Sequence, residues 1–468
     1  MSIDQCIAQL RTLLLPPQVV TAGPEIVRLS KSLSYHTPHE PRCVVFAESE
    51  ADIVAVLKCA NSHKVPVIPV AGRSSIEGAT IPLASVPTIS LDVSRMDRVV
   101  ALHEDDLDVV VQPGVGWMEL EEVLKPVGLF FPPDPGAAAC VGGMCGTNCS
   151  GTFAWRYGTM KDNVISLRVV LPDGTVVRTR RRPKKSSAGY DLTRLFIGSE
   201  GTMGIISEIT LRLRPIPKLT CVALACFASI EDAGAAVQHI VKEGIDLQRM
   251  ELMDSHAIHS INLSRGISTA PLAEQSTLLF ELAGPSPTSL AEQLTSVQRI
   301  CKSSHATLFR SASDAAESTH LWAIRKTAYF AAKRLRPDLP SPEILTTDVA
   351  VPISRLAEAL SRTRADLASH SLKATILAHA GDGNFHCLLV VDPANVAEMK
   401  AVSAFRDRNA HMAIDMDGTC TGEHGVGTGK VHLLEREVGP EALGLMRTIK
   451  AAVDPNGIMN PGKVLARL

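Results

Sequence analysis

Apolar residues in the first half of the chain recur at two spacings. Ser49 followed by Asp52 has the pattern of a helix N-cap, and Ile53, Val56 and Leu57 then repeat at helical spacing, which predicts a helix with one buried face. The other apolar runs are short and end at glycine or proline, as strands do. We therefore expect strands at 65–70, 88–93, 107–112, 165–171, 175–179 and 205–213, and a second helix at 117–124.

Prolines and one turn position some of these strands. Pro66 and Pro69 cannot donate to a strand ladder, so the strand at 65–70 should lie at an edge or end there. Pro172-Asp173-Gly174 predicts a hairpin turn between the two strands that flank it. The first half is thus expected to be rich in short strands and tight turns.

Helices and strands alternate in the second half. Helices are expected near 229–242 and 289–303, with a strand near 278–282 between them. Arg214-Pro215-Ile216-Pro217 separates the two halves and is the main predicted domain boundary. This order of elements predicts an α+β domain with an antiparallel sheet after the boundary.

The composition of the 468 residues is that of an ordinary globular enzyme, with 45% hydrophobic and 21% charged residues. A net charge of −2 and an aromatic content of 4% imply no nucleic-acid partner and no anionic membrane surface. No apolar run reaches the ~20 residues that a membrane-spanning helix needs. The 11 cysteines form no disulfide-like frame, so we expect a reducing compartment. Cys140, Cys145 and Cys149 match no metal-binding spacing and are interpreted as small residues in a tight loop.

Both termini bear on localisation. Residues 1–15 are poor in arginine and contain Asp4, unlike a mitochondrial transit peptide, and we recognise no secretory signal. Ala466-Arg467-Leu468 resembles the peroxisomal address Ser-Lys-Leu, although a plain polar tail also accounts for it. We therefore expect a cytoplasmic or peroxisomal protein, and disfavour a mitochondrial one.

Two glycine-rich loops predict a bound nucleotide. One covers 71–78, directly after a predicted strand, and the other lies within 132–158, a stretch of small residues with little charge. Such segments bury little side-chain area but let the backbone approach a phosphate or a flat ring. Neither a Rossmann fingerprint nor a P-loop is present: Gly114-Val115-Gly116 lacks the third glycine, and His424 replaces the first glycine of the P-loop-like match.

Several motifs, in order, resemble the FAD-binding segments of the vanillyl-alcohol-oxidase-type flavoproteins. They are Pro69-x-x-Gly72-x-Ser74-Ser75-Ile76-Glu77-Gly78, Asp134-Pro135-Gly136, Val141-Gly142-Gly143-Met144, Arg156-Tyr157-Gly158-Thr159 and Gly198-Ser199-Glu200-Gly201-Thr202. Within that family the chain is most similar to the branch of cytochrome-type D-lactate dehydrogenases, especially fungal ones, and glycolate oxidase D subunits. The similarity runs from about His36 to Val464, nearly the whole chain.

The resemblance implies a fold and a domain order. The expected fold class is α+β, with a vanillyl-alcohol-oxidase-type FAD-binding domain and an α+β cap domain that carries the substrate site on an antiparallel sheet. We assign an N-terminal lead-in at 1–40, the FAD-binding domain at 41–217, the cap domain at 218–455 and a C-terminal return to the flavin at 456–468.

The resemblance also implies which residues contact FAD. Backbone N–H groups of the two glycine loops would cradle the pyrophosphate, Gly201, Gly204 and Ile206 would lie along the adenine and ribose, and Asn460 would approach the flavin ring. The full expected set is Pro69, Gly72, Arg73, Ser74, Ser75, Gly78, Pro135, Gly136, Gly142, Gly143, Gly146, Thr147, Ser150, Gly151, Tyr157, Gly201, Gly204, Ile206 and Asn460. No histidine stands at a flavin-linking position in these loops, so we expect FAD held without a covalent bond.

Arg73 departs from the family pattern, which usually has glycine there. Its guanidinium could pair with a phosphate oxygen, or its bulk could crowd the loop. This departure from the family pattern leaves a second hypothesis open, in which the protein is not an enzyme. It would be a relic that has lost flavin and survives as a metal-binding or scaffold protein.

The segment 376–390 holds two histidines around a Gly-Asp-Gly-Asn turn. Read as a hairpin, it places His379 and His386 across from each other, with Cβ atoms ~5 Å apart. Two imidazoles at that distance can share a divalent ion, whereas a single histidine on a strand is more often a core residue. We therefore predict a metal site here that holds Zn²⁺ or Mn²⁺.

Three further site residues take their roles from the resemblance. Glu423 and His424 lie in a glycine-rich loop at 418–427, and by themselves could be a surface acid and base at a helix entry. The family branch implies instead that Glu423 completes a His-His-Glu metal site and that His424 is the catalytic base. Arg325 corresponds to the family's clamp for the substrate carboxylate, with a solvated helix charge as the alternative.

These parts predict a reaction. The metal would hold the hydroxyl and carboxylate oxygens of a D-2-hydroxy acid, His424 would take the hydroxyl proton, and hydride would pass to flavin N5. Tyr329, Thr346 and Leu388 match positions where related D-2-hydroxyglutarate dehydrogenases hold a second carboxylate. None of the three is cationic, so a monocarboxylate such as D-lactate is expected.

The electron acceptor is left open by the residues. The resemblance implies cytochrome c or another carrier as the acceptor. One alternative is O₂, which would make the protein an oxidase. The other is a set of iron–sulfur partners, which would make it a glycolate-oxidase-like subunit. A homodimer is held open. No nucleic-acid partner and no transmembrane segment are expected.

Overall fold

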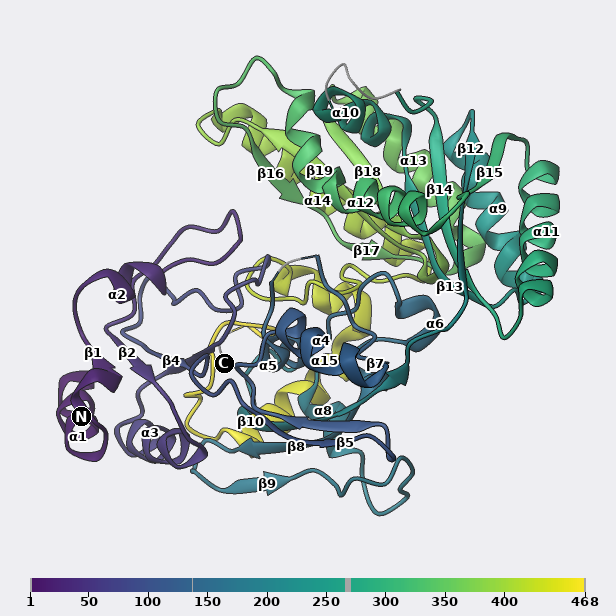
Figure 1. The fold of residues 1–468 in the computed structure, drawn as a ribbon. Helices are drawn as coiled ribbons and strands as arrows, with labels where there is room; N and C mark the ends of the chain where they lie inside the picture. Colours follow the sequence, from purple (N-terminus) through teal and green to yellow (C-terminus); the bar gives the residue numbers. More distant parts are fainter. Residues whose placement is uncertain (1, 137, 266–270, 467–468) are drawn as a thin grey trace. The chain divides into compact units, whose positions relative to one another are not determined.

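The computed structural model describes residues 2–136, 138–265 and 271–466 and divides the chain into two compact units (Figure 1). The first unit comprises Met1–Gly151, Tyr157–Ile216 and Glu423–Leu468, and the second comprises Thr152–Arg156 and Pro217–Gly422. The chain therefore leaves the first unit after Ile216 and returns to it at Glu423, whereas our division of the sequence places that return at 456.

A small sheet with strand order β1-β2-β4-β3 forms the N-terminal part of the first unit. β1 (Val19–Val20) is antiparallel to β2 (Cys43–Phe46), while β2, β4 (Ile89–Asp92) and β3 (Val67–Val70) run parallel. β3 lies at the edge, as its proline content predicts.

Helix α3 (Glu50–His63) begins as its sequence predicts. Ser49 Oγ accepts from the Asp52 backbone N–H, and the Asp52 carboxylate accepts from the Ser49 N–H at 3.0 Å, which satisfies two of the donors that a helix start leaves unpaired. The predicted apolar face of α3 is buried and packs against α1 (Ile3–Leu13) in the N-terminal lead-in. Short elements complete this part: η1 (Pro16–Gln18) and α2 (Pro24–Arg28).

A second sheet in the first unit is antiparallel, with order β5-β6-β10-β8-β9. Its strands are β5 (Val99–His103), β6 (Asp108–Val111), β10 (Ile205–Arg212), β8 (Val164–Val170) and β9 (Val176–Arg178). The predicted turn at Pro172–Gly174 joins β8 to β9, and Gly174 adopts a φ of 84° there. Thus the strands expected from the short apolar runs are present at their predicted places.

A helix stands where the cysteine cluster suggested a tight loop. α5 (Val141–Thr147) carries three glycines, and a Cβ on Gly142 would lie 2.5 Å from Pro113 Cβ. The loop interpretation was wrong because glycine has a low helix propensity, and this helix forms where glycine lets its backbone pack closely. The remaining elements are α4 (Trp117–Leu124), η2 (Lys125–Val127), α6 (Ala154–Tyr157), α7 (Met160–Asn163), α8 (Leu192–Phe196) and the paired strands β7 (Leu129–Phe130) and β11 (Arg214–Pro215).

The second unit is built on one antiparallel sheet, which confirms the fold expected for the second half. Among the described residues its order is β15-β12-β14-β13-β18-β19-β16, with β17 paired to β19. The bounds are β12 (Thr220–Phe227), β13 (Leu247–Met253), β14 (Ser276–Ala283), β15 (Ala306–Ser311), β16 (Glu343–Thr346), β17 (Val349–Ala350), β18 (Ala374–His379) and β19 (Asn384–Val391).

Helices cover this sheet (Figure 1). α10 (Ser255–Arg265) and α12 (Ala315–Ala331) share an apolar cluster with Leu377, Leu388 and Val390, which identifies the sheet face that they cover. α9 (Ile230–Glu243) and α11 (Pro287–Ser303) also contact β12 and β14, but their residues are not part of that cluster. The other helices of the unit are η3 (Ala332–Leu335), η4 (Ile353–Arg355), α13 (Leu356–Ser369), η5 (Ala380–Asp382) and α14 (Val396–Asp415).

The C-terminal segment belongs to the first unit. α15 (Val431–Val453) kinks at Gly439-Pro440, and the chain then runs beside the edge strand β3. The Val67 N–H donates to the Ile458 carbonyl at 2.8 Å, and the Asn460 N–H donates to the Val67 carbonyl at 2.9 Å. The exposed edge of the first sheet is covered in this way, and Asn460 is fixed beside the predicted first cofactor loop.

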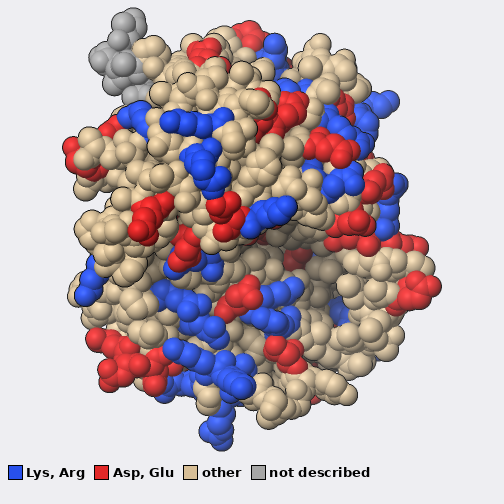
Figure 2. Space-filling model, turned by 90° about the vertical axis from the view of Figure 1, so that its right-hand side faces the viewer, with Lys and Arg blue, Asp and Glu red and all other residues tan. Residues whose placement is uncertain are grey.

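Acidic and basic side chains are interspersed over the surface that Figure 2 displays, in keeping with the net charge of −2. Within the described ranges, no helix combines the length and the hydropathy needed to cross a bilayer. The resemblance to a peroxisomal address rests on Arg467 and Leu468, which lie outside the described residues.

Candidate functional site

The second unit brings the two predicted metal histidines together. His379 ends β18 and His386 lies in β19, and their ring centroids are 5.5 Å apart. Alternate residues of a strand share a face, so these rings lie on the same face as Leu377 and Leu388, under α10 and α12. Both histidine side chains are largely buried, with 10% and 9% of their surface exposed.

The hairpin that carries these histidines differs in register from the prediction. His379 pairs with Asn384 and His386 pairs with Leu377, so the two histidines are diagonal rather than directly opposite. The short η5 helix and Gly383, with a φ of 73°, form the turn at Ala380–Gly383, one residue earlier than the expected Gly-Asp-Gly-Asn turn. A shift of two residues leaves every side chain on its original face, and the imidazoles therefore still meet.

Fixed acceptors orient both rings. His379 Nδ1 lies 2.8 Å from Glu251 Oε1, and His386 Nδ1 lies 3.1 Å from the Thr347 carbonyl oxygen. An imidazole whose Nδ1 donates to such an acceptor presents Nε2 as its metal-binding nitrogen. The donor set and its orientation fit a nitrogen-ligated divalent cation such as Zn²⁺ or Mn²⁺.

Glu251 is a site residue that the sequence reasoning missed. It lies in β13 with no exposed surface, and its other carboxylate oxygen accepts from Arg325 Nη2 at 2.6 Å. Burial alone would raise the pKa of this carboxyl, but the adjacent charges of His379 and Arg325 hold the pKa below its usual value. One buried carboxylate therefore orients both a predicted metal ligand and the predicted substrate clamp.

Arg325 lies in helix α12, as predicted, but it is not a solvated helix charge. Only 13% of its side chain is exposed, and the guanidinium faces Glu251. Its Nε is buried and has no hydrogen-bond partner among the described residues. An unpaired buried donor costs free energy that an incoming carboxylate would relieve, so the geometry suits the clamp reading.

The three residues predicted to meet the substrate tail lie near one another. Thr346 pairs with Leu388 across β16 and β19, and burial raises the pKa of the Tyr329 hydroxyl, which lies near enough for the Thr346 side chain to lower it. Leu388 is buried in the apolar cluster beneath α12. None of the three supplies a positive charge, so a second carboxylate placed here would gain no ion pair from them.

Glu423 and His424 stand at the point where the chain re-enters the first unit. Ser150 Oγ donates to Glu423 Oε2 at 2.7 Å, and His424 Nε2 lies 4.0 Å from Glu423 Oε1. The two side chains are 12% and 13% exposed, which does not fit a surface acid and base at a helix entry. Ser150, predicted as a cofactor residue, is thus in direct contact with the predicted metal glutamate.

Segments that are distant in sequence meet around the predicted cofactor loops. A Cβ on Gly201, where φ is 69°, would lie 2.2 Å from Pro69 Cγ, so the two backbones approach as only glycine allows. Asn460 Nδ2 donates to the carbonyl oxygens of Ala79 at 3.0 Å and Glu200 at 2.7 Å. The first loop, the 198–202 motif and the C-terminal segment therefore form one cradle within the first unit.

This cradle has the openings that a bound cofactor needs. A Cβ on Gly136 or Gly143 would meet no described atom within 4 Å, and one on Gly146 would touch only the Glu200 Cα at 4.0 Å. Asn460 Oδ1 is buried without a hydrogen-bond partner among the described residues. Open backbone next to an unsatisfied acceptor fits a flat, phosphate-bearing group such as FAD.

The other predicted cofactor residues lie in the same unit. Ser75 Oγ closes the first loop by accepting from the Ala79 N–H at 3.1 Å, and a Cβ on Gly151 would lie 2.3 Å from Asp134 Oδ1, which joins the second loop to the 134–136 motif. The remaining members of the set in this unit are Gly72, Ser74, Gly78, Pro135, Gly142, Thr147, Tyr157, Gly204 and Ile206.

The structure gives a physical account of the unusual Arg73. Its backbone φ is 55°, in the left-handed region that glycine adopts most easily, so a glycine would fit this position without strain. Its Nη1 donates to the Arg28 carbonyl oxygen at 3.1 Å. The side chain is thus held by the protein itself, a third arrangement beside phosphate pairing and crowding of the loop.

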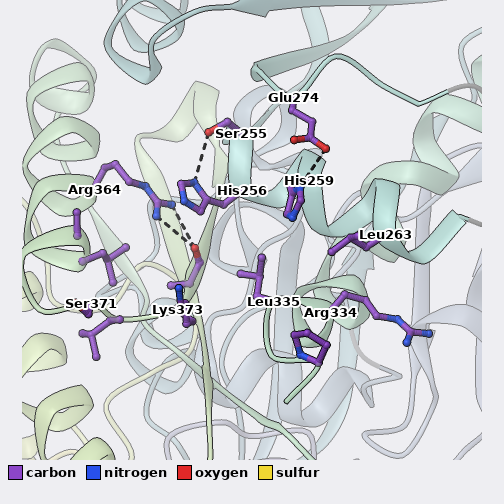
Figure 3. Close-up of a pocket in the computed structure, with 15 residues that line it drawn as sticks. Ser255, His256, His259, Leu263, Glu274, Arg334, Leu335, Arg364, Ser371 and Lys373 are labelled. Carbon is purple, nitrogen blue, oxygen red and sulfur yellow. Dashed lines mark hydrogen bonds and ion pairs between the residues drawn. The ribbon is translucent and has the colours of Figure 1, made fainter. Parts of the chain in front are cut away.

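A separate cavity of about 780 Å³ lies within the second unit (Figure 3). It is lined by α10, the end of α13 and the start of β18. Arg364 Nη1 donates to the Ala374 carbonyl oxygen at 3.4 Å, and Figure 3 shows His259 paired with Glu274. None of the predicted site residues lines it. The predicted chemistry belongs to the sheet face of Glu251, His379 and His386 instead.

The open face of α5 gives a first testable prediction. Gly143→Leu should lower the FAD content at least about tenfold without unfolding the protein, because leucine would fill the cradle while its helix propensity exceeds that of glycine by ~1 kcal/mol. FAD released by heat per mole of protein measures this. Gly444→Leu is the matched control, since a Cβ on that α15 glycine would also meet no atom of the described residues within 4 Å. Full FAD content in Gly143→Leu would show that the cofactor lies elsewhere.

Two family descriptions match the chain. "FAD binding domain" covers residues 41–180, and "FAD linked oxidases, C-terminal domain" covers residues 216–464. Together they agree with the predicted pairing of an FAD-binding domain with a second, α+β domain. The FAD-binding match supports FAD as the cofactor, and it contains the two glycine-rich loops at 71–78 and 132–158.

Curated relatives extend over most of the chain. A cytochrome-type mitochondrial D-lactate dehydrogenase of Arabidopsis thaliana is 48% identical and covers 91% of this chain and 73% of its own length. A probable mitochondrial D-lactate dehydrogenase of Danio rerio is 42% identical over 92% of this chain and 86% of its own length. Glycolate oxidase subunit GlcD of Bacillus subtilis is 33% identical over 91% and 89%.

Solved structures confirm the predicted fold class. The 4-ethylphenol oxidase of Gulosibacter chungangensis superposes with a TM-score of 0.80 over 99% of this chain and 97% of its own, at 17% identity. p-Cresol methylhydroxylase gives the same TM-score, coverage and identity. At this level of identity the likeness concerns the fold alone.

The predicted localisation was wrong. We expected a cytoplasmic or peroxisomal protein, yet the relatives from Arabidopsis thaliana, Danio rerio, Saccharomyces cerevisiae and Kluyveromyces lactis are all named as mitochondrial. The error has a physical basis: targeting signals are short segments read by receptors, so neither a three-residue tail nor the composition of residues 1–15 decides the compartment.

The cradle of glycine loops, the two matching domains and the relatives that span most of the sequence lead to one conclusion. This chain belongs to the FAD-linked oxidases, and it is a flavin-dependent oxidoreductase built from an FAD-binding domain and the family's C-terminal domain.

Proposed function

We propose that this enzyme dehydrogenates a D-2-hydroxy monocarboxylic acid, of which D-lactate is the prototype, to the 2-keto acid. The observation that carries the proposal is the buried Glu251 carboxylate, which binds both Arg325 of helix α12 and His379 of strand β18. A carboxylate clamp beside a cation-binding imidazole is what a 2-hydroxy acid requires, because its two functional groups sit on adjacent carbons. The names of the relatives, D-lactate dehydrogenase and glycolate oxidase subunit, support the same substrate class.

We infer that His379 and His386 hold a divalent cation, with Glu423 of the first unit as the third ligand. The oriented Nδ1 groups of both histidines support the first part, and the family resemblance supports the assignment of Glu423. A divalent cation at this place supplies Lewis-acid chemistry, which lowers the pKa of an adjacent hydroxyl.

Arg325 and His424 would have separate roles in the proposed reaction. Arg325 grips the substrate carboxylate through donors that Glu251 leaves available, so the position of Cα is fixed. His424 accepts the hydroxyl proton, a role suited to imidazole because its pKa lies near neutral pH. FAD supplies the redox chemistry, since its isoalloxazine ring accepts a hydride.

We further propose that FAD is held without a covalent bond and that electrons leave for a carrier such as cytochrome c. The absence of histidine from the predicted flavin-linking positions supports the first point, and the word "cytochrome" in the names of three relatives supports the second. Flavin that stays with the polypeptide after acid precipitation would contradict the first; failure to reduce cytochrome c, beside rapid use of O₂, would contradict the second.

A comparison of reaction rates with different 2-hydroxy acids tests the proposed function. We expect kcat/KM for D-lactate and D-2-hydroxybutyrate to exceed that for D-2-hydroxyglutarate by about a hundredfold, because a second carboxylate next to Thr346 and Leu388 has no cation to pair with. L enantiomers should react near background. Dye-linked reduction over a panel of D and L acids measures both preferences.

A variant sharpens this test. Leu388→Arg places a guanidinium in the predicted tail pocket and should narrow the preference for D-lactate over D-2-hydroxyglutarate, whereas Leu345→Arg, at the neighbouring buried position on β16, should not. Wild-type preference for D-2-hydroxyglutarate would show that these residues do not meet the substrate tail.

A further inference from the structure

Glu200 holds the loop that follows His424. Its carboxylate oxygen Oε1 accepts from the Val426 N–H at 2.6 Å, and Oε2 accepts from the Gly427 N–H at 2.9 Å. Two successive backbone N–H groups converging on one anion form a nest, a geometry that otherwise binds phosphate or carboxylate ligands. Here the anion is a side chain of the same unit.

The glycines of this loop are shaped for that contact. Gly425 and Gly427 adopt φ values of 82° and 51°, and a Cβ on Gly425 would lie 2.7 Å from Glu200 Oε1. Any other residue at Gly425 would therefore be strained and would push the carboxylate away. One buried carboxylate thus holds the N–H groups of Val426 and Gly427, while the Val464 N–H donates to the Gly427 carbonyl oxygen at 3.0 Å.

Glu200 is itself anchored on both sides. Its backbone N–H donates to the Gly146 carbonyl at 2.9 Å, and its own carbonyl accepts from Asn460 Nδ2 at 2.7 Å. Gly146 and Asn460 are both predicted cofactor residues. The carboxylate consequently ties the His424 loop to the cradle in which we place FAD.

Charges near Glu200 are few and identifiable. Burial raises the pKa of Glu200 to about 7, an effect that the N–H groups of Val426 and Gly427 oppose. That value includes the effects of two nearby charges, because Glu77 raises the pKa and Lys430 lowers it. Experiments on this residue are best made at pH 8, where most Glu200 side chains are ionised.

We propose that Glu200 is a positioning residue for the catalytic base: its carboxylate clasps the Val426 and Gly427 N–H groups and so fixes His424 relative to the FAD cradle. The inference rests on the proposed role of His424 and deepens it. Misplacing a catalytic group by about 1 Å costs on the order of a hundredfold in rate, so loss of this clasp should affect turnover more than binding.

Kinetics of purified, FAD-loaded variants test the proposal at pH 8. Glu200→Ala should lower kcat for D-lactate by about 10- to 100-fold with KM changed less than about threefold, and Glu200→Gln, which keeps one acceptor oxygen, should recover part of the loss. Asp52→Ala is the matched control, because Asp52 also accepts from two backbone N–H groups in this unit, at 2.9 and 3.0 Å, but far along the chain from the loop. It should leave kcat unchanged.

A double variant separates positioning from general damage. In the His424→Ala background, adding Glu200→Ala should cost less than about twofold, because a residue that acts through His424 has nothing left to position. Wild-type kcat in Glu200→Ala beside an inactive His424→Ala, or a full additive loss in the double variant, would overturn this inference and leave the proposed base intact. An active His424→Ala would instead overturn the assignment of the base.

Hydrogen–deuterium exchange gives a readout that does not depend on turnover. The amides of Val426 and Gly427 should exchange slowly in the FAD-loaded wild type and at least about tenfold faster in Glu200→Ala, with exchange in α3 and β8 unchanged. Unchanged exchange at both amides would show that the carboxylate does not hold the loop, and would overturn the proposal.

Discussion

Replacement of His424 by alanine should reduce kcat for D-lactate by about 10²- to 10⁴-fold, the range typical of a lost general base, while FAD and metal contents stay at wild-type levels. The reason is that His424 is proposed to move a proton rather than to ligate the cation or the cofactor. Steady-state kinetics, heat-released FAD and elemental analysis on the same preparation measure the three quantities.

A matched histidine controls for nonspecific effects of this substitution. His63, a half-buried residue of the same unit, hydrogen-bonds Gln9 and is not among the predicted site residues, so His63→Ala should retain wild-type kcat. Exogenous imidazole should restore part of the activity of His424→Ala, because a small base can occupy the vacated space. Wild-type turnover in His424→Ala would place the base elsewhere.

Removal of His386 should empty the proposed cation site. His386→Ala and His386→Asn should each lose at least about nine-tenths of the bound Zn²⁺ or Mn²⁺, because two remaining ligands hold such ions weakly. The asparagine variant preserves a donor for the Thr347 carbonyl oxygen, which His386 Nδ1 contacts at 3.1 Å, and so limits the structural damage. Elemental analysis of dialysed protein provides the measurement.

Two controls accompany this metal-binding prediction. His370→Ala, an exposed histidine of the same unit that pairs with Asp366, should keep its full metal content. Circular dichroism should establish that both His386 variants are folded. Unchanged metal in folded His386→Asn would remove the site as we describe it.

Local patterns in the sequence predicted most of the first unit. The Ser49–Asp52 cap, the edge strand with its prolines and the Pro172–Gly174 turn are each decided by nearby residues, and each is present. Glycine loops in family order also sufficed to predict the cofactor and the fold class. α5 was missed because its glycines, read locally, oppose a helix, and only the close packing of Gly142 on Pro113 explains them.

The site of the second unit was only partly accessible to such reasoning. The sequence predicted that His379 and His386 would share a face, but their register depends on η5 and Gly383, which place the turn one residue earlier than assumed and so shift the cross-strand pairing by two residues. Glu251 was missed because it contacts His379 and Arg325 across 128 and 74 positions of sequence. A glutamate between Met250 and Leu252 was a usable signal, since a charge is seldom buried without partners.

The contact between Glu200 and the loop after His424 could not be predicted from one sequence, because its partners are also distant along the chain. Its partners, Val426 and Gly427, are separated from it by more than two hundred residues, and only the folded first unit brings them together. The family motif Gly198–Thr202 predicted a cofactor-binding segment, but it did not indicate that Glu200 binds a second loop. Long-range polar contacts of this kind decide where the proposed base stands.

The visible spectrum of the purified protein tests the central claim most directly. Under anaerobic conditions, D-lactate should bleach the flavin band of the yellow protein within the time of a few turnovers, while equal concentrations of L-lactate and D-2-hydroxyglutarate should leave it nearly unchanged. A spectrum that D-lactate does not alter, in protein that carries both FAD and the divalent cation, would contradict the assignment of this enzyme as a D-2-hydroxy monocarboxylate dehydrogenase.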